Sequence, residues 1–299
     1  MSDVGHRPTM SDVGLDEPDW THRERLHQKR VDEFCEPRRR RARVGEAHPV
    51  WDFLWTYYSL RPRQLRVWHP GFGVALGGAE AQRYLGRAGY GRGRDGVTVT
   101  VEHLRTRADT VRFIAGLLHA TASRQPRLNC FGMHEWAMVY RAPTVRHEQV
   151  PLRLGQAGTD AVVDSMPLRC SHFDAYRFFT EPAAKRNVER LTRDGQVGSE
   201  QPACIHANMD LYKWAFKLGP LVCSELVMDC LELAARARSL DMRASPYDLR
   251  DYGFDAITVE TPAGRAEYVR AQQRIAEQAA PLRAALARQC DLLTAAAGE

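Results

Sequence analysis

The sequence predicts a helix-rich α+β fold in a single globular domain with a few short strands. Apolar residues recur at helical spacing in several segments, most clearly from Thr106 to Ala122. By contrast, Val97, Val99 and Val101 alternate with polar residues, as in a half-buried strand. The apolar content of 44% in 299 residues is enough to bury a sizeable core.

The N-terminal part is expected to differ from the rest of the chain. Residues 1–45 are expected to form a flexible basic arm, and residues 46–299 a single globular catalytic domain. Within the arm, a charged helix is expected from Trp20 to Phe34, ending at Pro37. The basic run Arg38–Arg43 is interpreted either as a linker or as a segment that binds phosphate.

The elements of the domain follow from local patterns. Pro49 suits the start of a largely buried helix in HPVWDFLWTYYSLRP. Thr261 and Pro262 suit the cap and first turn of a long closing helix, bent at Pro281. Further helices are expected at Met133–Tyr140, at CIHANMDLYKWAFKLGP and at Pro220–Arg238. Further strands are expected near Val150–Leu154, at Ala161–Val163 and in DAITVETP.

Positive charge is concentrated in one part of the chain. Residues 61–127 contain twelve arginines and four acidic residues, a local charge of +8 in a chain whose net charge is +5. Because neutralised phosphates release counterions, such a segment is typical of a surface that binds a polyanion. We therefore expect DNA contacts around RYLGRAGYGRGRDG, a basic loop or hairpin tip. The expected phosphate contacts are Arg87, Arg92, Arg94, Arg105 and Arg107.

Composition also bears on where the protein acts. No run of about 18 apolar residues occurs, and the N-terminus has no signal-peptide pattern, so no membrane partner is expected. Seven cysteines without CxxC spacing indicate neither a disulfide framework nor a thiolate zinc site. A cytoplasmic protein is expected.

One polar stripe is the first candidate site. His206, Asp210, Lys213 and Lys217 lie at i, i+4, i+7 and i+11, and therefore share one face if their segment is helical. Only four of the 42 basic residues are lysines, so two on one face are notable. A lysine can lose its proton, whereas an arginine cannot. The alternative is a solvated helix face with an Asp–Lys pair.

Three clusters combine histidines and carboxylates with aromatic residues. They are His134-Glu135-Trp136, His172-Phe173-Asp174 and the segment from His206 to Asp210. If these elements converge, they supply imidazoles and carboxylates to one cavity, which suits either a metal site or metal-free acid–base chemistry.

In the metal hypothesis, His172 and Asp174 lie on a strand and point the same way. His206 then completes a two-histidine, one-carboxylate site, with His134 as a further ligand. Iron or zinc would be the cofactor, or haem held by a single axial histidine. The protein would then be an oxygenase or hydrolase of a small molecule.

In the metal-free hypothesis, a carboxylate stabilises a developing sugar cation while a glycosidic bond to a base breaks. Asp210 and Glu135 are the candidate carboxylates, with His206 beside them. Lys213 would bind phosphate, pair with a carboxylate or, if it lost its proton, attack the sugar. No cofactor is needed. The candidate residues for stacking on the base are Trp136, Tyr212 and Trp214.

The segment DMRASPYDLRDYG is a further candidate, because charged and aromatic residues crowd a turn at Pro246. Arg243 and Tyr247 would bind substrate there. The alternative is ordinary Asp–Arg pairing on a surface turn.

Five segments together resemble a group of actinobacterial proteins labelled 3-methyladenine DNA glycosylase. The segments are HPVWDFLWTYYSLRP, LNCFGMHEWAMVYR, RCSHFDAYRFF, HANMDLYKWAFKLGPLV and DMRASPYDLRDYGFD. The resemblance spans most of residues 46–270 and implies an enzyme that excises or processes a damaged or modified purine. The chain has no LPGVG-type hairpin loop, so the resemblance assigns no catalytic residue. A DNA-binding accessory protein without enzyme activity is the third hypothesis.

Overall fold

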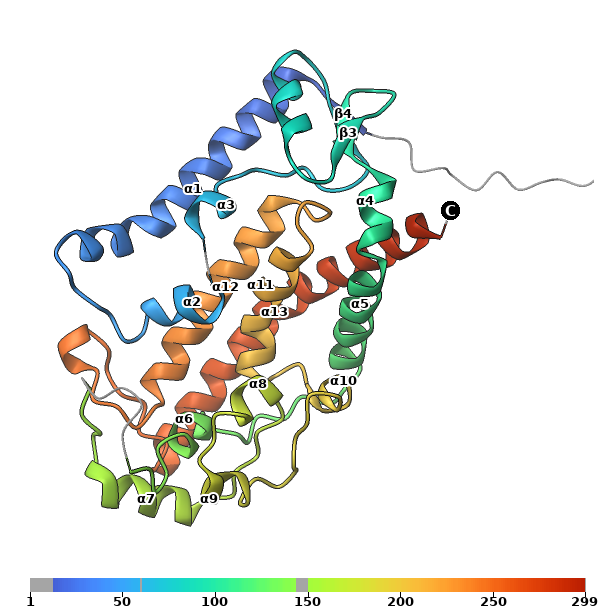
Figure 1. Cartoon of the computed structure of the whole chain (residues 1–299). Helices are drawn as coiled ribbons and strands as arrows, with labels where there is room; N and C mark the ends of the chain where they lie inside the picture. Colours follow the sequence, from blue (N-terminus) through green and yellow to red (C-terminus); the bar gives the residue numbers. More distant parts are fainter. Residues whose placement is uncertain (1–12, 60, 144–149, 299) are drawn as a thin grey trace, which may run out of the picture.

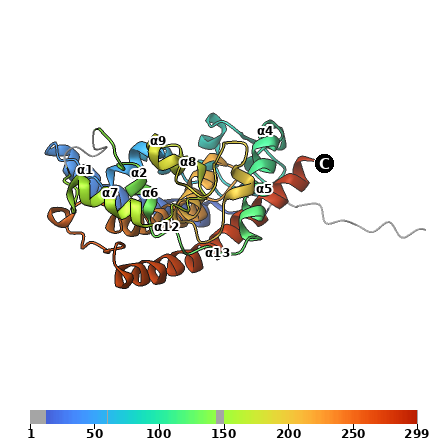
Figure 2. The same ribbon diagram turned by 90° about the horizontal axis from the view of Figure 1, so that it is seen from below.

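Three helices near the C-terminal end of the chain form the centre of the molecule. In the computed structural model, which describes residues 13–59, 61–143 and 150–298, α12 (Ser224–Arg243) packs against both α11 (Ile205–Lys217) and α13 (Pro262–Ala297). α5 (Ala108–Ala122) packs against α13 on another side (Figure 1). In Figure 2, α13 extends across the width of the molecule. The helix-rich α+β prediction is confirmed.

A small sheet accompanies these helices. It contains β1 (Val13–Leu15), β2 (Val74–Leu76), β3 (Tyr90–Arg92) and β4 (Val97–Val99) in the order β1-β2-β4-β3. β1 and β2 are parallel and the other pairs are antiparallel, so β3 and β4 form a hairpin. The strand and the hairpin tip expected here are confirmed, although Val101 already belongs to the next helix, α4 (Val101–Thr106).

The expected flexible arm is wrong for the residues that the structure describes. α1 (Glu17–Arg43) is one continuous helix that passes through Pro37 and includes the basic run. Trp20 and Val31 are fully buried, and α1 packs against α12. Arg30 also forms ion pairs with two acidic residues of α12, Asp229 and Glu232. The buried residues of this helix recur at helical spacing and include the ionisable Glu24 and His27. Residues 1–12 of the expected arm lie outside the described residues.

Short helices and connecting segments cover one side of the central helices. The segment at Pro49 does form a helix, but it begins later, as α2 (Asp52–Tyr57), and only Leu54 and Trp55 are buried in it. The others are α3 (Pro62–Leu65), η1 (Glu80–Gly86), α6 (Met133–Ala137), α7 (Gly155–Ser165), α8 (Phe173–Tyr176), α9 (Glu181–Ala184), α10 (Gln196–Ser199) and η2 (Arg250–Tyr252).

Several expected strands are wrong. Ala161–Val163 lies inside α7, because Thr159 and Val163 are buried at a spacing of four residues. DAITVETP contains no strand, although Ile257 and Val259 are buried. Near Val150–Leu154 there is only an isolated bridge, between Leu152 and Tyr247. In each case, a short run with β-branched or other apolar residues was taken for a strand, whereas tertiary packing decides the conformation.

The long closing helix is confirmed at its predicted start. The Thr261 side chain accepts a hydrogen bond from the Gly264 amide, and Pro262 occupies the first turn. The helix continues through Pro281 to Ala297. Among the described residues, no helix combines the length and the apolar character needed to cross a membrane.

Candidate functional site

The fold brings the three histidine clusters together. His134 lies on α6, His172 directly precedes α8, and His206 lies in the first turn of α11. The imidazole centroids of His134 and His206 are 4.3 Å apart, and those of His206 and His172 are 5.4 Å apart. All three side chains are buried. The expected convergence of these elements is therefore found.

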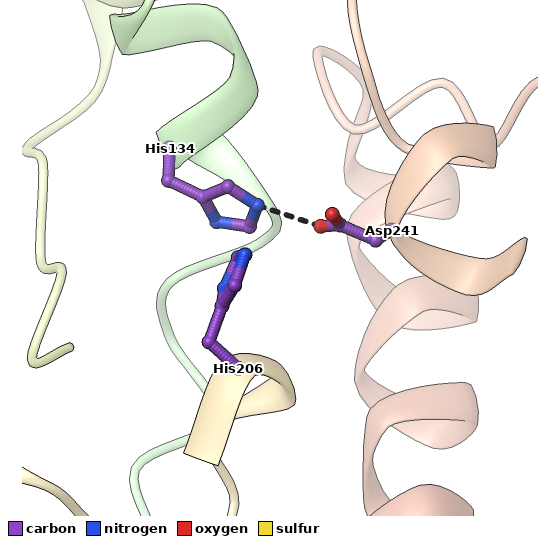
Figure 3. A group of neighbouring side chains, drawn as sticks. All are labelled: His134, His206 and Asp241. Atoms are coloured by element: carbon purple, nitrogen blue, oxygen red, sulfur yellow. Dashed lines mark ion pairs between the residues drawn. The ribbon is translucent and has the colours of Figure 1, made fainter. Parts of the chain in front are cut away.

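A carboxylate outside the three predicted clusters completes the central group. Asp241, near the end of α12, is fully buried and faces both His134 and His206 (Figure 3). One ligand atom from each of the three residues lies within 4.8 Å of the others. This set of two imidazoles and one carboxylate, the His134 site, is one that zinc and iron(II) both accept.

The contact between His134 and Asp241 is unusual. Nε2 of His134 lies 2.6 Å from Oδ1 of Asp241, yet the two atoms do not have the geometry of a hydrogen bond. Neither atom has a hydrogen-bond partner elsewhere in the described part of the chain. Buried polar atoms normally have one.

The pKa values of the two histidines of this site are shifted in opposite directions. Burial disfavours the charged form of His134, but the neighbouring Asp241 carboxylate outweighs it, so the pKa of His134 is raised. Burial lowers the pKa of His206 well below its usual value, and the nearby charge of His134 lowers it further. Asp241 keeps a lowered pKa despite its burial, because of His134. His206 is therefore neutral at physiological pH, which is the state that binds metals.

Arg238 holds the other side of Asp241. Its Nη1 donates to Oδ2 of Asp241 at 3.0 Å and to Oε1 of Glu135 at 2.8 Å. The guanidinium also lies 3.9 Å from the ring centroid of Phe53. Arg238, Glu135 and Asp241 are all buried. Arg238 thus orients Asp241 from outside the His134 site, as second-layer partners of metal ligands commonly do.

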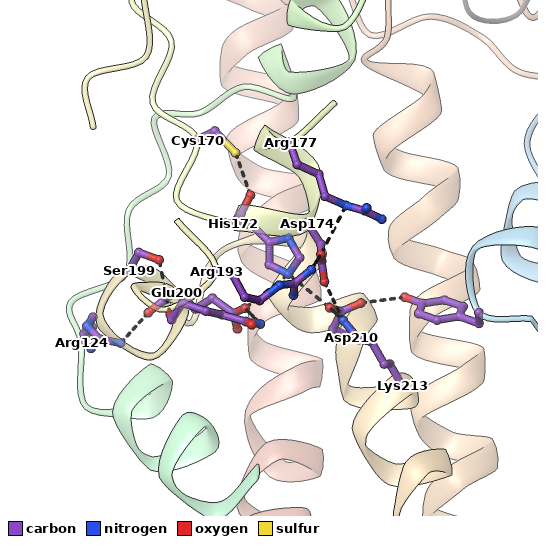
Figure 4. A network of polar contacts seen from close by, with 12 residues as sticks. Arg124, Cys170, His172, Asp174, Arg177, Arg193, Ser199, Glu200, Asp210 and Lys213 are labelled. Atoms are coloured by element: carbon purple, nitrogen blue, oxygen red, sulfur yellow. Dashed lines mark hydrogen bonds and ion pairs between the residues drawn. The ribbon is translucent and has the colours of Figure 1, made fainter. Parts of the chain in front are cut away.

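His172 belongs to an adjoining acidic group, the His172 network (Figure 4). Its Nε2 lies 3.3 Å from Oδ2 of Asp210 and 3.4 Å from Oε1 of Glu200. Burial opposes charge on His172, but Glu200 and Asp210 outweigh it and raise its pKa. Gln196 donates to Glu200 at 2.6 Å and holds that carboxylate in place. His172 and these acids therefore form a buried ion-pair group.

Lys213 and Asp174 extend this network toward the surface. Nζ of Lys213 donates to Asp174 at 2.7 Å and to Asp210 at 3.0 Å. The other oxygen of Asp174 accepts from Arg193 at 2.6 Å. Burial alone would lower the pKa of Lys213, but Asp210 and Asp174 raise it above its usual value. Lys213 is thus a charged ion-pair partner, so its expected role as a neutral nucleophile is not supported, whereas the expected carboxylate pairing is found.

A cavity of about 700 Å³ lies beside both groups. Its walls include Phe53, Tyr57, Glu135, Asp174, His206 and Arg238. His134 lies behind His206, against a separate void of about 20 Å³. His172 and Asp210 line neither space. His206 is therefore the residue through which the His134 site meets the large cavity.

Two residues of the expected ligand set, Asp174 and His172, lie outside the His134 site. Asp174 was expected to bind a metal beside His172 and His206, but its two oxygens are bound to Arg193 and Lys213. It lies on α8 rather than on a strand, so the expected HxD geometry does not form. His172 also lies apart from the His134 site, because its Nε2 faces Asp210 and Glu200. The carboxylate that joins His206 is Asp241, and the second imidazole is His134.

The expected substrate-binding residues do not line the cavity. Trp136 is fully buried, and its indole donates to the carbonyl of Ala244 at 2.8 Å. Tyr212 and Trp214 face the hydrophobic core. Tyr247 is packed in a second, smaller apolar cluster, and Arg243 donates to the carbonyl of Asp255. Aromatic residues on amphipathic helices most often serve packing, and these do so too.

The expected phosphate contacts lie elsewhere. Arg92 and Arg94 are exposed on the β3–β4 hairpin, Arg105 is exposed on α4, and Arg87 is exposed at the start of the hairpin. Arg107 is half-buried and donates to the carbonyl of Lys217. Figures 1 and 2 place α4 at one end of the molecule and α6, with the His134 site, toward the other. The exposed arginines Arg87, Arg92, Arg94 and Arg105, here called the basic surface, therefore do not adjoin the cavity.

The sequence contained a signal for Asp241. Its helix was expected to end at Arg238, with four residues facing inward. α12 instead continues to Arg243. The same spacing of three and four residues then gives one buried row: Val222, Leu226, Cys230, Leu233, Ala237 and Asp241. Because Asp241 continues the spacing of these apolar residues, it is predicted to lie on the buried face of the helix. A buried carboxylate needs a hydrogen-bonding or charged partner.

Neither a family model, nor a curated protein, nor a solved structure matches this chain.

Proposed function

We propose that this protein is a metal-dependent enzyme that acts on a small molecule in the 700 Å³ cavity. The His134 site, formed by His134, His206 and Asp241, would hold one divalent zinc or iron(II) ion. One observation carries the proposal: the buried Nε2 of His134 and Oδ1 of Asp241 lie 2.6 Å apart with no hydrogen-bond partner in the described part of the chain, next to His206. An ion between them satisfies both atoms.

Three protein ligands leave coordination positions open for water or substrate. A zinc ion would supply an activated water for hydrolysis, and an iron(II) ion would supply oxygen chemistry. The protein contributes the surroundings: His206 lies on the cavity wall, and Arg238 fixes Asp241. Glu135, the residue next to His134 in sequence, also lines the cavity and is a candidate to accept a proton there.

Removal of a damaged purine from DNA remains a prediction. Glu135 is the one of its two candidate carboxylates that lines the cavity, whereas Asp210 is buried among His172, Lys213 and Tyr58. The arginines expected to bind DNA lie at the other end of the molecule. The test is release of methyladenine from alkylated DNA. Release that is lost in Glu135→Gln or Asp210→Asn would support a glycosylase over the metal-dependent enzyme.

Metal analysis of the purified protein tests the proposal directly. We expect about one zinc or iron per chain, and a loss of that metal in His134→Ala, His206→Ala and Asp241→Ala. The matched control is His119→Ala, because His119 is exposed and pairs with Asp291 far from the site along the chain. A visible spectrum of the same samples separates haem from a directly bound ion. Wild-type protein that binds no transition metal, even after incubation with zinc and iron(II), would remove the proposal.

We also propose that the protein acts in the cytoplasm. All seven cysteines are free thiols. Free thiols are typical of proteins from a reducing compartment.

A further inference from the structure

We propose that the molecule bound in the cavity carries a carboxylate, and that this carboxylate binds to Nε and Nη2 of Arg238. The inference rests on the proposed metal-dependent function and names the class of its substrate: a small organic acid with a second oxygen group that reaches the metal.

Three of the five N–H donors of Arg238 are unused. Nη1 serves Glu135 and Asp241, but Nε and Nη2 have no partner in the described ranges of the chain. The side chain is only 1% exposed. Leaving buried charged donors unsatisfied is costly, and a protein retains such a cost mainly where a ligand satisfies them.

Arg238 lies in the right place for a substrate. Arg238 lines the large cavity together with Glu135 and His206. Its Nη1 lies 3.0 Å from Oδ2 of Asp241, the carboxylate whose other oxygen belongs to the His134 site. An acid bound to Arg238 therefore lies within a few bonds of the proposed metal. The ring of Phe53, 3.9 Å from the guanidinium carbon, holds the plane of the guanidinium in one orientation.

The planar geometry of Arg238 suits a carboxylate. Nε and Nη2 of an arginine form a planar fork that matches the two oxygens of a carboxylate. The cavity walls also carry the acids Asp52, Glu135 and Asp174.

Two hydroxamates that differ only in one carboxylate test this inference. Butanohydroxamate and the monohydroxamate of succinic acid share the same metal-binding group, and their affinities for the metal-containing protein can be measured by calorimetry. We expect the acid to bind at least about tenfold more tightly to the wild type. In Arg238→Lys, which keeps the charge near Glu135 and Asp241 but loses the planar fork, we expect the two affinities to become nearly equal.

Two variants serve as controls. Arg236→Gln changes an exposed arginine of the same helix, α12, that contacts Gln278 and does not line the cavity. Arg177→Gln removes the other arginine of the cavity wall, which lies 3.4 Å from Asp174. The preference for the acid should persist in both variants. If the preference for the acid were lost in Arg177→Gln but kept in Arg238→Lys, the carboxylate would bind beside Arg177. That result would overturn the assignment to Arg238.

The outcomes separate this inference from the proposed function. If the wild type binds both hydroxamates equally, the carboxylate inference fails while the metal site stands. If the wild type contains metal but binds neither hydroxamate, or contains no metal, both fail. If Arg238→Lys does not fold, the comparison of the wild type with Arg177→Gln decides the matter.

Discussion

The imidazole of His134 and the carboxylate of Asp241 meet in the interior of the molecule, 2.6 Å apart and shielded from solvent. They come from α6 and α12, and more than a hundred residues separate them in sequence. The contact couples two properties that are measured separately: the stability of the metal-free protein and its affinity for a metal.

Replacing Asp241 is expected to weaken the metal-free protein. Asp241→Asn leaves the buried charge of His134 without its counter-charge, so the free energy of unfolding should fall by about 3–5 kcal/mol. Urea unfolding of metal-free samples measures this change. Asp229→Asn, on the same helix but in a half-exposed pair with Arg30, should cost less than about 1 kcal/mol. An increase in stability on replacing Asp241 would contradict a stabilising ion pair and indicate a site held under repulsion.

The contribution of His172 to stability is expected to decrease as the pH rises. Its pKa lies above the usual value of 6.5, because Glu200 and Asp210 outweigh the effect of burial. A raised pKa in the folded state contributes stability that is complete below the unfolded pKa and is lost as the pH passes the folded one. His172→Gln should therefore be most destabilising near pH 6, and less so near pH 9, in urea titrations. A difference that grows toward high pH would show that His172 is neutral in the folded protein.

The basic surface can be tested independently of the cavity. Replacing Arg92, Arg94 and Arg105 together by glutamine should weaken binding to duplex DNA. It should also reduce the slope of log affinity against log salt by up to about three, one for each phosphate that the protein no longer neutralises. The metal content should not change, because the three residues lie away from the His134 site. An unchanged salt slope would place any DNA contact on another surface.

The docked position of α1 can be tested through Trp20. Its side chain is fully buried, and its indole donates to the carbonyl of Gly77 at 2.9 Å. Trp20→Ala should lower the free energy of unfolding by about 3–5 kcal/mol, as core aromatic truncations do. Leu26→Ala, at an exposed position of the same helix, should change it by less than about 0.5 kcal/mol. Equal effects would mean that α1 does not pack on the core.

Local patterns predicted the helices that carry the site. The spacing of His206, Asp210 and Lys213 placed them on one face of α11, and the structure has that helix. Thr261 and Pro262 likewise marked the start of α13. Such signals succeed because helix periodicity and caps depend on residues within a few positions of each other.

Three short apolar or β-branched segments were wrongly predicted as strands, because strand formation depends on a partner strand that lies elsewhere in the sequence. Ala161–Val163 has no such partner and lies in α7. The prediction of a flexible arm failed for a related reason. The charge of Glu17–Arg43 is visible in the sequence, but the core that buries Trp20 is formed by distant residues.

By itself, the sequence determined a helix-rich α+β protein whose histidines and acids fall in three clusters. Only the tertiary structure decided which of them meet: His134 and His206 with Asp241, and His172 with Asp210 and Glu200. The physical reason is the range of the interactions. Periodicity fixes which face of a helix a residue occupies, whereas the choice of partner depends on how separate helices pack, and one residue of shift along α12 would turn Asp241 away from the imidazoles.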